Sequence, residues 1–158
     1  MAVDVSDSTD SSAAAELTAA AERLLELLGR EDSELSIMIV DDAHMRHLNR
    51  EWRGKDRPTD VLSFPQLESD AGPFADEEEI PLGDVVISID TARVQAEAGG
   101  WMLQEELNRL LLHGVLHLLG YDHENGGEEE RRMKAEEQRL ADALARSGHP
   151  CARDQATE

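Results

Sequence analysis

Three histidines at spacings of four and six residues constrain this chain more than any other feature. They lie in the segment His113-Gly-Val-Leu-His117-Leu-Leu-Gly120-Tyr-Asp-His123. An α-helix turns once in 3.6 residues, so His113 and His117 project from one helical face. Gly120 has no Cβ and can take the left-handed conformation that ends a helix, which would bring His123 back to the same point. The spacing therefore predicts a metal site with His113, His117 and His123 as its ligands.

The number of histidines indicates the kind of metal site. Imidazole nitrogens are common zinc ligands, and three of them leave one position of a tetrahedral zinc open. A structural zinc site fills all four positions with protein ligands, whereas a catalytic site keeps one position for water. The pattern therefore favours a hydrolase that holds one Zn²⁺ per chain.

Gly114 bears on which bond such a hydrolase cuts. The zinc proteases with the motif H-E-x-x-H-x-x-G-x-x-H share this metal spacing but carry a glutamate as general base where this chain has Gly114. Without that carboxylate, peptide hydrolysis lacks its proton shuttle, so a peptidase is disfavoured. A phosphodiester is a better substrate, because a cation and a metal can stabilise its charged transition state.

Two further segments stand beside the histidine motif. One is Arg53-Gly-Lys-Asp-Arg-Pro-Thr-Asp-Val-Leu-Ser-Phe-Pro65, and the other is Leu82-Gly-Asp-Val-Val-Ile-Ser88. Together the three blocks resemble the YbeY family of bacterial endoribonucleases and rRNA maturation factors. They occur in the family's order, and the resemblance extends over roughly residues 34–147.

The resemblance implies a zinc-dependent, single-strand-specific endoribonuclease that acts in ribosomal RNA processing, notably at the small-subunit rRNA 3′ end, and in ribosome quality control. It assigns the metal to His113, His117 and His123, and a functional role to Arg53. A planar guanidinium can grip a phosphate in bidentate fashion, so Arg53 is the predicted catalytic residue. The implied partners are single-stranded RNA, a ribosomal RNA precursor, and the small subunit or its assembly proteins.

Two alternative functions stay open at this point. One is a metallopeptidase of the zincin type, which Gly114 disfavours. The other is a non-catalytic ribosome-assembly factor in which zinc is only structural. Neither a DNA substrate nor a membrane is expected. The N-terminal segment carries aspartates where a secretory signal has a basic region, so we expect a cytoplasmic protein.

The charge of the chain is unevenly distributed. The net charge is −20, which repels nucleic acid unless basic residues gather locally. Five basic residues and only two acids lie between Arg46 and Arg57, a local charge of +3 that leaves −23 on the remainder. This distribution predicts weak RNA contact that a partner guides.

Hydrophobic patterning predicts a single mixed α/β domain of the α+β class over residues 1–158. A small four-stranded sheet packs with about five helices around a zincin-like three-histidine site. The expected strands are 2–6, 34–41, 60–64 and 83–89, and the expected helices are 13–28, a helix after 41, 91–98, 103–119 and 127–146. An acidic loop near 66–80 is expected to be flexible, and the tail from about 148 to be disordered.

Several side chains receive more specific expectations. Met45, Leu48 and Trp52 form the predicted buried stripe of the helix after residue 41, while His44 and His47 on that helix are expected in solvent. Asp90 is expected to cap the helix that follows it, and the helix 127–146 to serve packing alone.

The remaining candidates have weaker expectations. Asp84 and Asp122 could each orient a metal-bound histidine or merely cap a turn. Strand alternation favours an outward hydroxyl for Ser63. The single cysteine, Cys151, is read as an exposed thiol with no role in the site.

Overall fold

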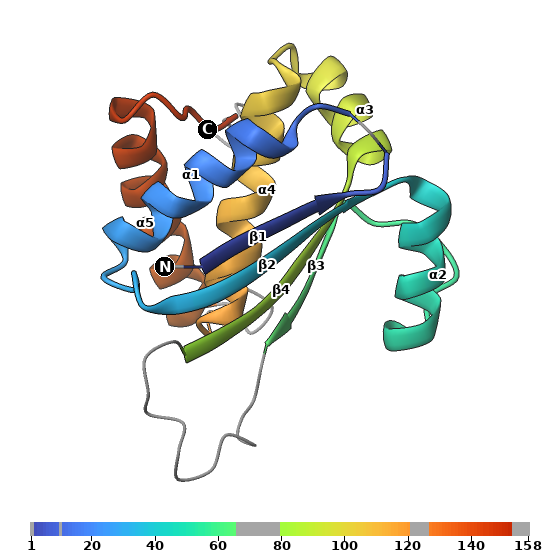
Figure 1. The fold of residues 1–158 in the computed structure, drawn as a ribbon, viewed down its shortest axis with the longest axis horizontal. Helices are drawn as coiled ribbons and strands as arrows, with labels where there is room; N and C mark the ends of the chain where they lie inside the picture. Colours follow the sequence, from blue (N-terminus) through green and yellow to red (C-terminus); the bar gives the residue numbers. More distant parts are fainter. Residues whose placement is uncertain (1, 10, 66–79, 121–126, 153–158) are drawn as a thin grey trace, which may run out of the picture.

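The computed structural model describes residues 2–9, 11–65, 80–120 and 127–152 and confirms the predicted α+β class (Figure 1). Its four strands are β1 Ala2–Asp7, β2 Ser33–Val40, β3 Val61–Pro65 and β4 Ile80–Ser88. The helices of the described residues are α1 Ala14–Leu27, α2 Asp42–Arg53, α3 Ile89–Gly99, α4 Leu103–Leu118 and α5 Gly127–Arg146. The expected acidic loop falls on residues 66–79, which lie outside the described residues.

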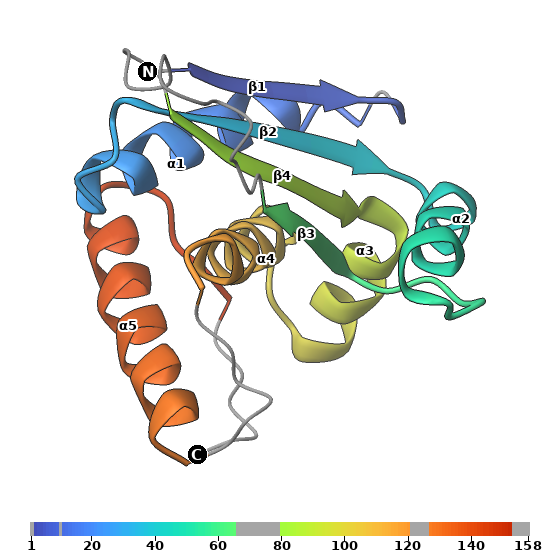
Figure 2. The same cartoon turned by 90° about the horizontal axis from the view of Figure 1, so that it is seen from below.

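The strands form one sheet in the order β1-β2-β4-β3. β1, β2 and β4 run parallel, and the edge strand β3 runs antiparallel to β4. Figure 2 shows α1, α4 and α5 gathered below one face of this sheet, with α4 next to β3 and β4. The edge strand therefore lies next to the helix that carries the first two histidines.

Most of the hydrophobic core lies between that sheet face and the helices. Alternate strand residues supply the sheet side, as in Ile37, Ile39, Val85 and Ile87, and all four are fully buried. The leucines of α4 fill the same core. This packing fixes the position of α4 against the sheet.

Helix α2 packs against the opposite face, where Met45 joins a second apolar cluster with Val40, Leu62 and Val86. The helix begins with Asp41, whose carboxylate accepts a hydrogen bond from the His44 backbone N–H, and His44 and His47 are exposed as predicted. The expectation of a buried Trp52 is wrong: the side chain is 69% exposed.

Trp52 is exposed because of its position at the edge of the sheet. Trp52 lies in the last turn of α2, where its ring meets Phe64 of the edge strand in a T-shaped contact with the centroids 5.8 Å apart. A helical period predicts which face a residue shares, but not where the neighbouring sheet ends.

Three smaller expectations also fail. Ser88 caps α3 by accepting from the Thr91 backbone N–H, whereas Asp90 accepts a hydrogen bond from the Asp42 backbone N–H. The tail does not lose order at 148, because the Asn108 side chain donates to the Pro150 carbonyl and the Ala152 N–H donates to the Glu105 carbonyl. These bonds hold Cys151 in the core, so its thiol is buried and not exposed.

In the described part of the chain, no helix has both the length and the apolar character needed to cross a membrane.

Candidate metal centre

Helix α4 brings two of the three predicted ligands together. The Nε2 atoms of His113 and His117 lie 3.1 Å apart, with the rings inclined at 70°. Two nitrogens that bind one tetrahedral zinc at the usual bond length lie roughly 3.3 Å from each other. The two imidazoles are therefore spaced as neighbouring ligands of one ion, as the interval of four residues predicts.

The third predicted ligand, His123, lies outside the described residues, as does Asp122. Within residues 2–9, 11–65, 80–120 and 127–152, no group of three metal-binding side chains gathers. The pair on α4 is thus the part of the predicted ligand set that the structure describes.

A carboxylate from α5 holds the first histidine. The Glu137 Oε2 atom lies 2.9 Å from Nδ1 of His113. A carboxylate only accepts, so Nδ1 carries the hydrogen and Nε2 of a neutral ring keeps its lone pair toward His117. The expectation that this helix serves packing alone is therefore wrong. Sequence reasoning missed Glu137 because it lies 24 residues from His113, and no local spacing joins them.

Asp84 does not take this role. Val85 is fully buried against α4, so the alternation of β4 turns the exposed Asp84 to the opposite sheet face.

The glycine of the histidine motif permits the close approach of α4 to the sheet. A Cβ on Gly114 would lie 2.8 Å from Cγ1 of Val85 and 3.1 Å from Oγ of Ser63. Ser63 points inward, against expectation, and donates a hydrogen bond of 2.9 Å to the Gly114 carbonyl. The site therefore has no room at position 114 for the glutamate of a zinc protease.

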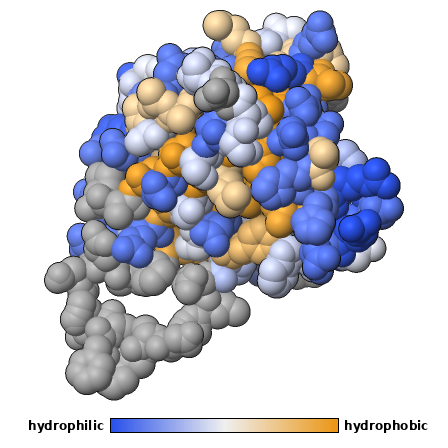
Figure 3. Space-filling view, turned by 45° about the vertical axis from the view of Figure 1, so that its right-hand side comes forward, coloured by the Kyte–Doolittle hydropathy of each residue, from blue (hydrophilic) through white to orange (hydrophobic). Residues whose placement is uncertain are grey.

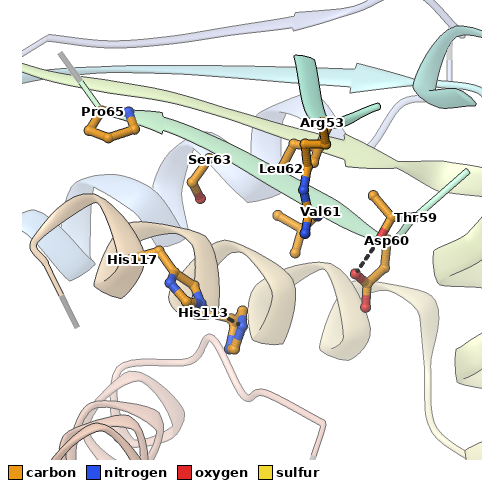
Figure 4. A pocket seen from close by; sticks show the side chains of 9 residues that line it. All are labelled: Arg53, Thr59, Asp60, Val61, Leu62, Ser63, Pro65, His113 and His117. Atoms are coloured by element: carbon orange, nitrogen blue, oxygen red, sulfur yellow. Dashed lines mark hydrogen bonds between the residues drawn. The ribbon is translucent and has the colours of Figure 1, made fainter. Parts of the chain in front are cut away.

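A pocket of about 510 Å³ opens beside the two histidines. β3 and the residues before it line one wall, α4 lines another, and Arg53 enters from the end of α2. Figure 4 shows the Arg53 side chain extending across β3 toward the side where His113 and His117 lie. The structure thus brings the predicted catalytic arginine and two predicted ligands, 60 or more residues apart in the sequence, into one cavity.

The pocket also contains a carboxylate that sequence reasoning did not single out. Asp60 lines it beside Thr59, whose hydroxyl lies 3.5 Å from the carboxylate. The signal was its place inside the Arg53–Pro65 block, directly before β3.

The basic residues around α2 divide into two groups. Arg46 donates two hydrogen bonds to Asp56, and Arg50 lies 3.9 Å from the same carboxylate. The hydrogen bond from Arg46 lowers the pKa of Asp56. Among the described residues, no ion pair is found for Arg53, Lys55 or Arg57, and all three are exposed. These three cations are available to a charged ligand.

Comparisons with known proteins identify relatives of this chain. A family model described as Endoribonuclease YbeY matches residues 3–145. An Endoribonuclease YbeY from Aquifex aeolicus is 49% identical over 80% of this chain and 81% of its own length. One from Geobacter metallireducens is 50% identical over 81% and 84%. The solution structure of a Thermotoga maritima protein, 23% identical, superposes with a TM-score of 0.64 over 99% of both chains, which supports the fold.

Proposed function

Because this chain belongs to the YbeY endoribonuclease family, we propose that it is a zinc-dependent, single-strand-specific endoribonuclease of ribosomal RNA processing. One structural observation carries the proposal. Arg53 and the histidine pair of α4 line the same pocket, so a phosphate-binding cation and metal-binding nitrogens face one substrate. We treat residues 1–158 as one catalytic domain.

The donor set fits zinc. His113 and His117 offer nitrogens at ligand spacing, and His123 completes the proposed set of three. When bound, a zinc ion polarises the groups that it contacts and stabilises negative charge. Glu137 keeps the hydrogen of His113 on Nδ1 and fixes the direction of the ring.

Of the other pocket residues, Arg53 acts on the substrate and Ser63 holds the site in shape. Arg53 grips the scissile phosphate and stabilises the charge that develops there, because its guanidinium has no ion pair to break among the described residues. Ser63 holds the α4 backbone in place through the Gly114 carbonyl. RNA is the partner of the reaction, and we propose that a small-subunit rRNA precursor in the cytoplasm supplies it near its 3′ end. The same cleavage would serve ribosome quality control.

The two alternative functions have less support. A zincin-type peptidase needs a proton shuttle at position 114, where a Cβ would meet Val85. A non-catalytic assembly factor with structural zinc gives no reason for a charged arginine in the pocket.

Cleavage of a defined precursor RNA by the zinc-loaded protein tests the proposal. We expect cleavage that a chelator abolishes, and a loss of about 10²–10³ in rate for Arg53→Ala, which keeps its zinc. Arg53→Lys should recover little, because an ammonium lacks the planar fork. Arg50→Ala removes an exposed arginine of the same helix that does not line the pocket, and it serves as the matched control. Parental cleavage by Arg53→Ala, or cleavage of casein in place of RNA, would contradict the proposal.

A further inference from the structure

Trp52 is a large exposed side chain beside the proposed active site. It is 69% exposed, although tryptophan and phenylalanine are scarce in this chain, with two of each. Single exposed apolar residues are common on protein surfaces, so exposure alone means little. Its neighbours distinguish Trp52 from the equally exposed Met102.

The ring of Trp52 packs against one aromatic neighbour. It meets Phe64 at an interplanar angle of 67°, and Phe64 itself packs against the apolar cluster under α2. An exposed aromatic ring that already packs against one neighbour loses less conformational entropy than a free one when a second flat group stacks on it.

Trp52 also adjoins the pocket. The next residue in the chain, Arg53, lines it, and Phe64 lies between Ser63 and Pro65, which line it too. Phe64 and Ser63 point to opposite faces of the edge strand. A strand of RNA that passes over the edge of β3 can therefore place a phosphate in the pocket and a neighbouring base on Trp52.

The charges around Trp52 favour a polyanion that follows residues 53–57 and not one that crosses the sheet face beyond Phe64. Arg53, Lys55 and Arg57 follow it without an ion pair among the described residues. The open sheet face beyond Phe64 is acidic instead, because Phe64 pairs in register with Asp84 and that row ends at Asp4. Figure 3 shows hydrophilic residues over most of one side of the molecule, with hydrophobic ones reaching the surface in patches between them.

We propose that Trp52 is a nucleobase-stacking subsite that positions single-stranded RNA next to the scissile phosphate. This inference rests on the proposed function. It adds Trp52, which stacks on a base, to Arg53, which binds the phosphate backbone. Stacking on an exposed aromatic ring accepts any base and favours single strands, because the bases of a duplex are already stacked. Purines should bind more strongly than pyrimidines because their rings are larger.

Tryptophan fluorescence of the zinc-loaded protein tests the subsite directly. The chain has two tryptophans, and the partly buried Trp101 donates a hydrogen bond from its Nε1 to the buried Glu106. A short oligoadenylate, mixed in and read before cleavage proceeds, should quench the parental emission. An abasic ribose-phosphate chain of equal length should not. In Trp52→Phe, where Trp101 is the remaining emitter, the quenching should vanish.

Affinity and cleavage complete the test. Trp52→Ala should bind oligoadenylate about tenfold more weakly, Trp52→Phe should recover part of this loss, and Met102→Ala should match the parent. Equal affinity of Trp52→Ala and the parent, or equal affinity of the parent for the abasic chain, would overturn the subsite. So would a Trp52→Ala variant that fails only on RNA inside ribosomal subunits, since that pattern indicates a protein contact. If parental protein cleaves no RNA, the proposed function fails independently of these binding results.

Discussion

At the scale of single residues, the contact between Glu137 and His113 has the clearest consequence for the metal. The carboxylate lies 2.9 Å from Nδ1 and fixes which nitrogen faces His117. We expect Glu137→Gln to weaken zinc binding by about 10–100-fold, as the loss of such outer partners typically does. Competition with a chromophoric chelator measures this without any reference to RNA cleavage.

The neighbouring residue supplies the control for that substitution. Glu136 pairs with Arg139 on the same helix and has no contact with the histidines in the described structure. Glu136→Gln should keep the parental zinc affinity. If both variants hold zinc equally well, Glu137 has no part in positioning His113.

Gly114 gives a second expectation at this scale. A Cβ at this position meets Val85 at 2.8 Å, so Gly114→Ala must push α4 away from the sheet. We expect a loss of about 1–3 kcal/mol in the free energy of unfolding, the usual cost of overpacking, measured by urea denaturation. Adding Val85→Ala removes the nearest atom, and the double variant should lose less than the two single losses combined. Strict additivity would show that the close approach is not what requires glycine.

At the scale of secondary-structure elements, β1 leads into α1 through a turn that Asp7 organises. Its carboxylate accepts hydrogen bonds from the backbone and hydroxyl groups of Thr9 and Ser11. Partial burial raises the pKa of Asp7, but the hydrogen bonds outweigh it and lower the pKa from 3.8 to about 2. The turn therefore stabilises the fold only while this carboxylate is charged.

The sign of the pH dependence follows from that shift. A lowered pKa in the folded state contributes stability above the unfolded value, and this stability is lost as the pH falls from 3.8 toward 2. At neutral pH we expect Asp7→Asn to lower the free energy of unfolding by about 1–2 kcal/mol. The difference from the parent should shrink as the pH approaches 2, in denaturation series at several pH values. A difference independent of pH would mean that the charge has no role.

The elements also separate what a sequence can predict from what it cannot. Periodicity locates α4, because a helix depends on residues within a few turns of one another. It misplaces Trp52, since burial there depends on where the edge strand β3 lies. It misses Glu137 for the same reason, because α5 reaches His113 only through the packing of two helices. The pairing of His113 and His117 is predictable from their interval of four residues. The position of Arg53 in the same pocket depends on the whole fold.

At the scale of the whole molecule, the charge distribution limits how RNA can bind. The chain carries −20, while Arg53, Lys55 and Arg57 are the cations without an ion pair around the described pocket. Three phosphate contacts to a single strand predict that the logarithm of the binding constant falls with the logarithm of salt concentration at a slope of about −2. Titrations of oligoadenylate at several salt concentrations measure the slope. A much steeper dependence would require a larger basic surface than these residues provide.

Weak binding by so few cations leaves the choice of cleavage site to something else. An acidic body is repelled by most of a folded RNA, so a free chain should cut naked RNA slowly and at many single-stranded positions. We expect the same precursor RNA inside purified small subunits to be cut faster and near one site, because the subunit presents its single-stranded end to the pocket. Cleavage maps of naked and subunit-bound RNA, made with the same zinc-loaded protein, compare the two directly. Arg53→Ala should lose about 10²–10³ in rate on both RNAs, which separates the chemistry from the presentation. Identical sites and rates on both RNAs would mean that the chain selects its substrate without the subunit.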